Sequence, residues 1–208
     1  MERDLRDCDN LMQIYVESLF PTGVMIIDNF IDEHECDEIL TYIRGLDMHQ
    51  QDDTVPVNAK SSFDGVTDIV KDISEHTAVD DFYDRTTFAL NEYANVIGQP
   101  ELKLSNSWSH IQYEGSYVVD HTHPNSKVSG VLYLNTSKDS NNLIFKNPNP
   151  YSKIDAPVKG TDFNFTINEI PVGNGRLVMF PSWLEHGSNY NINKTQGRTM
   201  ISFNSLVK

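Results

Sequence analysis

The stretch 113-YEGSYVVDHTHPNSKVSGVLYLN-135 decides the fold, because it combines a strand-like run with two closely spaced histidines, His121 and His123. Residues i and i+2 of an extended strand project from the same face, so on a strand both imidazoles would leave one side and could bind one ion. A one-residue insertion would turn them to opposite faces. Taken alone, the pair is equally compatible with two ordinary polar residues at a strand end.

Two later segments offer further ligands for the same pocket. His186 lies in 177-LVMFPSWLEHGSN-189, where an apolar run is followed by a turn at Pro181. Arg198 begins an alternating run, TMISFNSLV, in which Met200, Ser202 and Asn204 share its face. Antiparallel pairing of neighbouring strands would bring the three histidines and Arg198 together. Three imidazoles with open coordination positions suit Fe(II), Zn(II) or Cu better than Mg²⁺ or Ca²⁺.

Five pieces of the chain, taken in order, resemble the Fe(II)/2-oxoglutarate-dependent oxygenases, and in particular their prolyl-hydroxylase-like branch with its phage and bacterial relatives. The resemblance spans residues 23 to 206. The pieces are GVMIIDNFIDEHECDEILTYI (23–43), YEGSYVVDH (113–121), HTHPNSKVSGVLYLN (121–135), GRLVMFPSWLEHGSN (175–189) and GRTMISFN (197–204).

The resemblance implies a role for each candidate site residue. His121, His123 and His186 would be the iron ligands, and together with Arg198 they form the catalytic set. Most of the family has Asp where this chain has His123, which leaves the identity of the third ligand open. Asp120 lies nearby, but as the neighbour of His121 it would point to the opposite face of the strand. The expected 2-oxoglutarate-binding residues are Arg198 for the C5 carboxylate, Tyr133 sharing that carboxylate, Tyr113 beside it, and Ser202 and Asn204 completing the pocket.

The activity that the resemblance implies is hydroxylation of a C–H bond with release of succinate and CO2. It would require Fe(II), 2-oxoglutarate and O2, with ascorbate as an optional addition. The substrate is expected to be a peptidyl side chain or a small molecule. Two alternatives stay open: a three-His cupin-type dioxygenase that does not use 2-oxoglutarate, and a non-catalytic jelly-roll module that holds a metal. A structural zinc site would need a fourth protein ligand, and none is evident in the sequence.

Length and composition limit the number of domains, the class of substrate and the cellular compartment. The chain has 208 residues, of which 38% are hydrophobic, and a net charge of −14. This length predicts one structural domain, and the acidic surface weighs against nucleic-acid substrates. No apolar run is long enough to span a membrane, and the charged start MERDLRDCDN is not expected to be a secretory signal. Two cysteines, Cys8 and Cys36, predict no disulfide framework and favour the cytoplasm, or the host cytoplasm if the source is viral.

The pattern along the chain changes at Pro100. Residues 1–100 are expected to supply an edge strand and helices that pack on a barrel formed by residues 101–208. The fold class is therefore mainly β with flanking helices (α+β), a double-stranded β-helix of the jelly-roll, cupin-like type. Residues 10–20 are expected to form a short helix or an irregular lead-in, and further helices are expected at 33–45 and in two segments within 64–98. Expected strands are 23–30, 102–112, 116–120, 128–135, 142–146, 163–168, 175–180 and 198–206, with 54–57 as a short addition.

Smaller expectations concern particular residues and loops. Gly115 is expected in a tight turn between two strands. His110, which shares the parity of Trp108 and Gln112, is not expected to be a metal ligand. The loops 46–63 and 147–161 are expected to carry substrate specificity, because binding residues concentrate on loops held by a rigid scaffold.

Overall fold

The computed structural model describes residues 15, 20–51, 57–150, 154, 158–161 and 164–208. The expected helix at 10–20 lies almost entirely outside these residues, as does much of the loop 147–161. None of the helices within the described ranges is long and apolar enough to cross a membrane.

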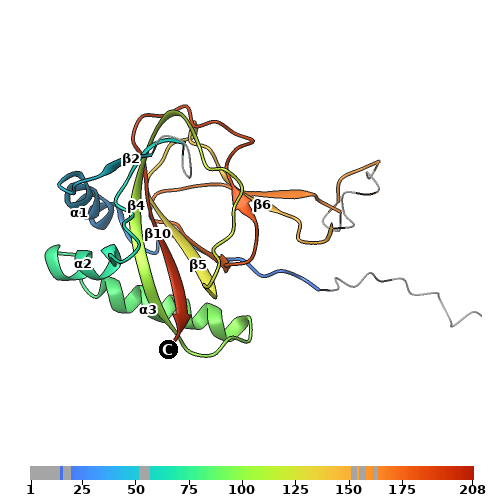
Figure 1. Cartoon of the computed structure of the whole chain (residues 1–208), viewed down its shortest axis with the longest axis horizontal. Helices are drawn as coiled ribbons and strands as arrows, with labels where there is room; N and C mark the ends of the chain where they lie inside the picture. The colour runs from blue at the N-terminus through green and yellow to red at the C-terminus, as the bar shows by residue number, and fades with distance from the viewer. Residues whose placement is uncertain (1–14, 16–19, 52–56, 151–153, 155–157, 162–163) are drawn as a thin grey trace, which may run out of the picture.

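Two antiparallel sheets face each other, and the three helices lie on the outer side of the larger one (Figure 1). Among the described residues the larger sheet has seven strands, in the spatial order β1 (Met25–Ile27), β8 (Leu177–Pro181), β5 (Val128–Asn135), β10 (Arg198–Val207), β4 (Leu102–Tyr117), β3 (Val57–Ser61) and β2 (His49–Gln51). The smaller sheet has the order β7 (Ile167–Ile170), β6 (Leu143–Lys146) and β9 (His186–Gly187). This arrangement confirms the predicted mainly-β, double-stranded β-helix architecture, with β1 at one edge of the larger sheet.

The larger sheet is buried on both faces, which explains the nearly continuous apolar run of β5. Leu132 and Leu134 belong to the core beneath the helices, whereas Val131 and Tyr133 belong to a second core between the two sheets. On β10, Ile201 and Phe203 face the helices in the same way. The alternate residues of these strands therefore face the interior between the sheets, where the candidate site lies.

The helices are α1 (Glu33–Arg44), α2 (Ile69–His76) and α3 (Phe82–Val96). At the start of α1, Asp32 accepts a hydrogen bond from the backbone N–H of Glu35, and the Glu35 carboxylate accepts one from the N–H of Asp32. This reciprocal cap satisfies two amide groups that the first turn leaves free, so it defines the beginning of the helix. The apolar stripes of all three helices then cover the outer face of the sheet.

Several element boundaries differ from those expected. β4 runs without a break through Gly115, which adopts φ +85° inside the strand instead of forming a turn. Residues 118–120 consequently belong to no strand. The expected loop 46–63 contains β2 and β3, which pair as a hairpin on β4. The strand expected at 163–168 is β7, found at Ile167–Ile170.

Candidate active site

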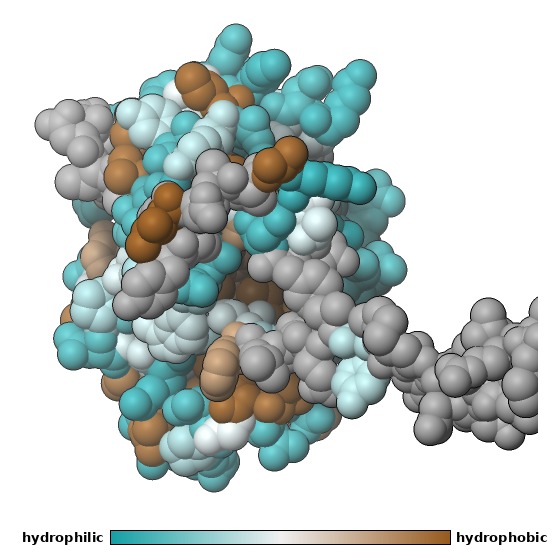
Figure 2. Space-filling view, turned by 90° about the vertical axis from the view of Figure 1, so that its right-hand side faces the viewer, coloured by the Kyte–Doolittle hydropathy of each residue, from teal (hydrophilic) through white to brown (hydrophobic). Residues whose placement is uncertain are grey.

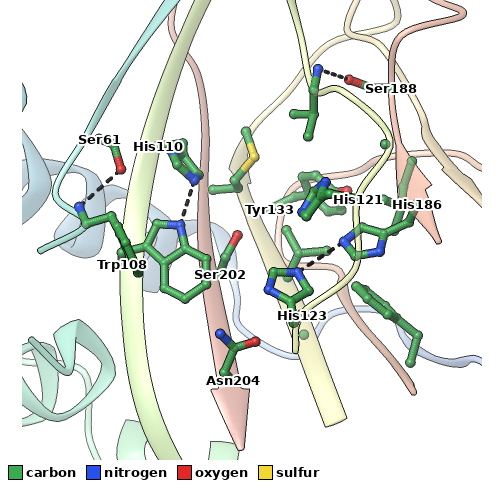
Figure 3. A pocket seen from close by; sticks show the side chains of 18 of the residues that line it. Ser61, Trp108, His110, His121, His123, Tyr133, His186, Ser188, Ser202 and Asn204 are labelled. Carbon is green, nitrogen blue, oxygen red and sulfur yellow. Dashed lines mark hydrogen bonds between the residues drawn. The ribbon is translucent and has the colours of Figure 1, made fainter. Parts of the chain in front are cut away.

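Three histidines converge between the two sheets. His121, His123 and His186 each offer one ring nitrogen, and these three atoms all lie within 4.8 Å of one another. The Nε2 atoms of His123 and His186 are 3.2 Å apart, and the ring centres of His121 and His186 are 4.4 Å apart. Figure 3 shows the three rings turned toward a common point. The predicted metal-binding trio is thus brought together by the fold.

Backbone pairing holds two of these histidines opposite each other. The N–H of His121 donates to the carbonyl of His186 at 2.9 Å, and the N–H of His186 donates back at 3.0 Å. His123 is placed by its own N–H, which donates to the carbonyl of Ser182 at 2.9 Å. The pair His121 and His123 therefore does not lie on a continuous strand. Its first member sits in an isolated bridge and its second at the turn that follows.

Hydrogen bonds behind the rings define which nitrogen faces the centre. Nδ1 of His121 lies 2.8 Å from the carbonyl oxygen of Val119, and Nδ1 of His186 lies 2.8 Å from that of Leu184. A carbonyl only accepts, so each Nδ1 carries the proton and each Nε2 keeps its lone pair. This is the usual arrangement of metal-binding histidines, in which the remote nitrogen is fixed by a backbone or carboxylate partner.

Burial keeps these imidazoles uncharged. It lowers the pKa of His123 to about 4, with a further contribution from the neighbouring His121. Burial also lowers the pKa of His121, and burial together with His121 lowers that of His186. Neutral imidazole is the form that binds a metal. Lone pairs crowded this closely suit a cation between them, so the donor set is compatible with a divalent first-row metal.

Arg198 lies in the same interior with an incomplete set of partners. Its side chain is buried, and Nη1 donates to Oε1 of Gln112 at 2.5 Å and contacts Sδ of Met200 at 3.3 Å. Its Nε has no partner, and no carboxylate of the described residues forms an ion pair with it. Burial lowers the pKa of Arg198, but a guanidinium does not lose its charge in proteins. The arrangement therefore calls for an anion.

A cavity of about 250 Å³ connects the histidines to Arg198. The predicted residues that line it are His121, His123, His186, Arg198, Tyr133, Ser202 and Asn204. Because the histidines are neutral, Arg198 is the one charged side chain among the described residues of its wall. The side of the molecule in Figure 2 is hollowed near its centre, and hydrophobic residues form the floor of this hollow.

Tyr113 does not line the cavity, which is contrary to the expectation that it lies beside the co-substrate. On β4 it follows Gln112, which pairs with Arg198 across the strands and shares its inward face. Consecutive strand residues point to opposite faces, so Tyr113 points away from the site. Asp120 is also outside the histidine cluster, and its carboxylate forms an ion pair with Lys146 at 2.8 Å.

The wall also contains residues that were not expected from the sequence, among them Trp108 and His110. The indole Nε1–H of Trp108 donates to Nε2 of His110 at 2.6 Å, and both side chains lie on the inner face of β4 (Figure 3). His110 is not part of the histidine cluster. The alternation Trp108, His110, Gln112 opposite Ser202, Met200, Arg198 is the signal that identifies the inward face.

Comparison with known proteins gives a consistent result. Residues 106–204 match the family described as "Putative 2OG-Fe(II) oxygenase". No curated protein matches this sequence significantly.

Solved structures share the fold at low sequence identity. One is HygX from Streptomyces hygroscopicus with nickel and 2-oxoglutarate bound, with 15% identity and a TM-score of 0.60 over 90% of this chain and 84% of that one. A second is the viral collagen prolyl hydroxylase of Paramecium bursaria Chlorella virus-1 in a 2OG complex, with 13% identity and a TM-score of 0.56 over 89% and 96%. A third is SnoN, a non-heme alpha-ketoglutarate-dependent epimerase from nogalamycin biosynthesis, with 13% identity and a TM-score of 0.63 over 89% and 77%.

Proposed function

We propose that this chain is a 2OG-Fe(II) oxygenase that hydroxylates a substrate with consumption of 2-oxoglutarate and O2 and release of succinate and CO2, and the match of residues 106–204 to that family supports the proposal. The observation that carries the proposal is one cavity that joins a three-histidine cluster to a buried arginine, which has no carboxylate partner within the part of the chain that the structure describes. A protein that only bound a metal would have no need for a buried arginine in the same cavity.

His121, His123 and His186 are the residues that would hold Fe(II). The carbonyls of Val119 and Leu184 fix the first and third rings, so their lone pairs are directed before a metal arrives. Bound there, Fe(II) would supply the activation of O2, the oxidant, while 2-oxoglutarate would supply two of the electrons and leave as succinate and CO2. Three neutral ligands would leave a bound metal with one more unit of positive charge than the common two-His-one-carboxylate set does.

Arg198 and Tyr133 are the residues that we assign to the distal carboxylate of 2-oxoglutarate. A guanidinium offers a planar pair of donors that matches a carboxylate. The guanidinium carbon of Arg198 lies 5.1 Å from the centre of the Tyr133 ring. Burial raises the pKa of Tyr133, so its hydroxyl stays protonated and remains able to donate. The residues thus neutralise one negative charge and orient the co-substrate toward the histidines.

Apolar side chains around the histidines exclude water from the reacting groups. Val131, Leu143, Phe180 and Met200 line the cavity and belong to the core between the sheets. A dry site strengthens the electrostatic contacts inside it and suppresses side reactions of reactive species. Positioning and water exclusion are the contributions we assign to the protein, while the oxidation belongs to the cofactor.

Asn204 we assign to the substrate instead of the co-substrate. It is six residues from Arg198 along β10, a separation of roughly 20 Å in an extended strand, which is too far for both to hold one carboxylate. The hydroxyl of Ser129 donates to Oδ1 of Asn204 at 2.8 Å and thereby directs the amide NH₂ elsewhere. Asn204 lines the cavity near His123 and Trp108 (Figure 3), where it can meet an acceptor on a peptidyl side chain or small molecule. Ser202 lies between the two ends and stays a candidate for the co-substrate.

A second candidate function is favoured by one observation, the all-histidine ligand set. Such a set also suits a cupin-type dioxygenase that does not use 2-oxoglutarate. The fold does not decide between them, because one fold hosts many reactions. The buried Arg198 favours the first function, because its guanidinium can bind the carboxylate of 2-oxoglutarate, which the second function does not use.

Succinate release tests the proposed function. The Fe(II)-loaded protein is supplied with 2-oxoglutarate in air and screened against blocked peptides, free amino acids and small metabolites. We expect succinate to form with at least one class well above the level of the His186→Ala variant, which lacks a ligand. Oxygen consumption without succinate would establish the 2-oxoglutarate-independent reaction instead. Absence of both in the wild type would reject an oxygenase function.

A further inference from the structure

His110 lies on the cavity wall between the arginine and the histidine cluster. On the paired strands β4 and β10, Gln112 is opposite Arg198, His110 is opposite Met200 and Trp108 is opposite Ser202. One step of two residues along β4, about 7 Å, therefore leads from the level of Arg198 to that of His110. The side chain of His110 is buried and faces the cavity (Figure 3).

The hydrogen bond from Trp108 fixes the tautomer of His110. An indole N–H only donates, so Nε2 of His110 must accept and the ring proton of the neutral imidazole must sit on Nδ1. Burial, followed by the charge of Arg198, lowers the pKa of His110 to about 3, so the ring is neutral at physiological pH. His110 therefore presents an N–H donor whose position is set by its neighbour.

This donor has no acceptor among the described residues. Nδ1 of His110 is buried and unpaired, and the same is true of Nε of Arg198 and Nε2 of Gln112. Each buried donor without a partner costs about 1–3 kcal/mol. Three such donors on adjacent inward positions of two paired strands indicate a missing ligand with several acceptor atoms. A carboxylate has four acceptor sites and one negative charge, which Arg198 alone can balance.

We propose that His110 binds 2-oxoglutarate, with its Nδ1–H donating to an oxygen of the co-substrate, and that Gln112 positions the Arg198 guanidinium for the same ligand. The inference rests on the proposed function and adds two residues to it. Gln112 acts through its Oε1, which accepts from Nη1 of Arg198 and leaves the remaining guanidinium donors for the carboxylate. His110 is the neutral contact and Arg198 the charged one.

The binding experiment uses the Ni(II)-loaded protein, which does not turn over, and titrates it with 2-oxoglutarate in a calorimeter. We expect His110→Phe to weaken 2-oxoglutarate binding about tenfold or more, because a hydrogen bond to a charged acceptor is lost. His110→Gln keeps an N–H donor and should recover most of that affinity. His49→Phe, a matched change at an exposed position on β2, should bind as the wild type does.

A nuclear magnetic resonance measurement distinguishes contact from a general structural effect. In the Zn(II)-loaded, ¹⁵N-histidine-labelled protein, we expect the Nδ1 proton of His110 to shift downfield on addition of 2-oxoglutarate. Trp108→Phe should weaken that response, because the proton is then free to move to Nε2. The shift in the wild-type protein is measured without the His110→Phe variant, so it stands even if that variant does not fold.

The outcomes separate this inference from the proposed function. A wild-type protein that does not bind 2-oxoglutarate would reject both. Wild-type binding with equal affinity in His110→Phe, or with no shift of the His110 proton, would reject the role of His110 and leave the proposed function intact. Binding that weakens equally in His49→Phe would also reject it, since the effect would not be specific to the cavity.

Discussion

At the scale of single residues, the site depends on imidazoles that are neutral because they are buried. His110 illustrates the energetic consequence, since its folded-state pKa of about 3 lies far below the ordinary value of 6.5. Between these two pH values the unfolded chain binds one proton more at this residue than the folded chain does. Lowering the pH therefore favours unfolding, and stability from this group is complete only above about pH 6.5.

The pH dependence of unfolding tests this neutrality. In the metal-free protein, His110 should make the free energy of unfolding fall by up to about 1.4 kcal/mol per pH unit as the pH drops from 6.5 toward 4. His110→Phe should have a shallower slope by that amount. Urea titrations at pH 7, 6 and 5 give the two slopes. Parallel slopes in the two proteins would mean that His110 titrates in the folded state as it does in the unfolded chain.

The identity of the third ligand is also a residue-scale question. His123→Asp restores the carboxylate that most of the family carries, so we expect it to retain iron binding and succinate formation. His186→Ala should lose iron almost completely, because that ring is buried and preoriented by Leu184. Iron content after anaerobic loading and desalting measures metal binding in both variants, and succinate release measures the activity of His123→Asp. Wild-type iron affinity in His123→Ala would exclude His123 from the metal site.

At the scale of elements, periodicity predicted most of the strands and helices, and their ends were less predictable. The helix 33–45 and the strand 128–135 agree closely with α1 and β5, because their capping residues and apolar patterns are local. Gly115 was expected to end a strand, but β4 continues through it since a glycine adopts a positive φ without steric cost. Of the hairpin of β2 and β3 only a short strand at 54–57 was expected, because the pairing with β4 that stabilises the hairpin is not revealed by any local pattern.

Gly130 provides an element-scale prediction about how β5 and β10 pack. It pairs with Phe203, whose ring lies over the glycine, and an added Cβ would approach Cε1 of that ring to 2.6 Å. Gly130→Ala should therefore destabilise the protein by about 1–3 kcal/mol through overpacking. Gly173→Ala, where an added Cβ meets nothing within 4 Å, is the control. Urea unfolding measures the stability of both variants. Equal stability of Gly130→Ala and Gly173→Ala would show that Phe203 moves aside freely.

At the scale of the whole molecule, spacing and order in the sequence predicted the metal trio and Arg198, but not the complete cavity. His121, His123, His186 and Arg198 each stand in a short recognisable segment, and the fold brings these segments together. From the sequence, Tyr113 was expected in the site and His110 was not, whereas in the structure His110 lines the cavity and Tyr113 does not. A single strand shows which residues share a face but not which face is inward. That choice follows from the register of β4 with β10.

The central claim is that one cavity holds a metal on three histidines and 2-oxoglutarate on Arg198. The most direct measurement is a titration of the Fe(II) protein with 2-oxoglutarate under nitrogen, followed by the weak metal-to-ligand charge-transfer band in the visible. We predict a saturable band in the wild type and at least about thirtyfold weaker binding in Arg198→Ala, with Arg198→Lys between them and iron binding unchanged. Equal 2-oxoglutarate affinity in wild type and Arg198→Ala would contradict the account.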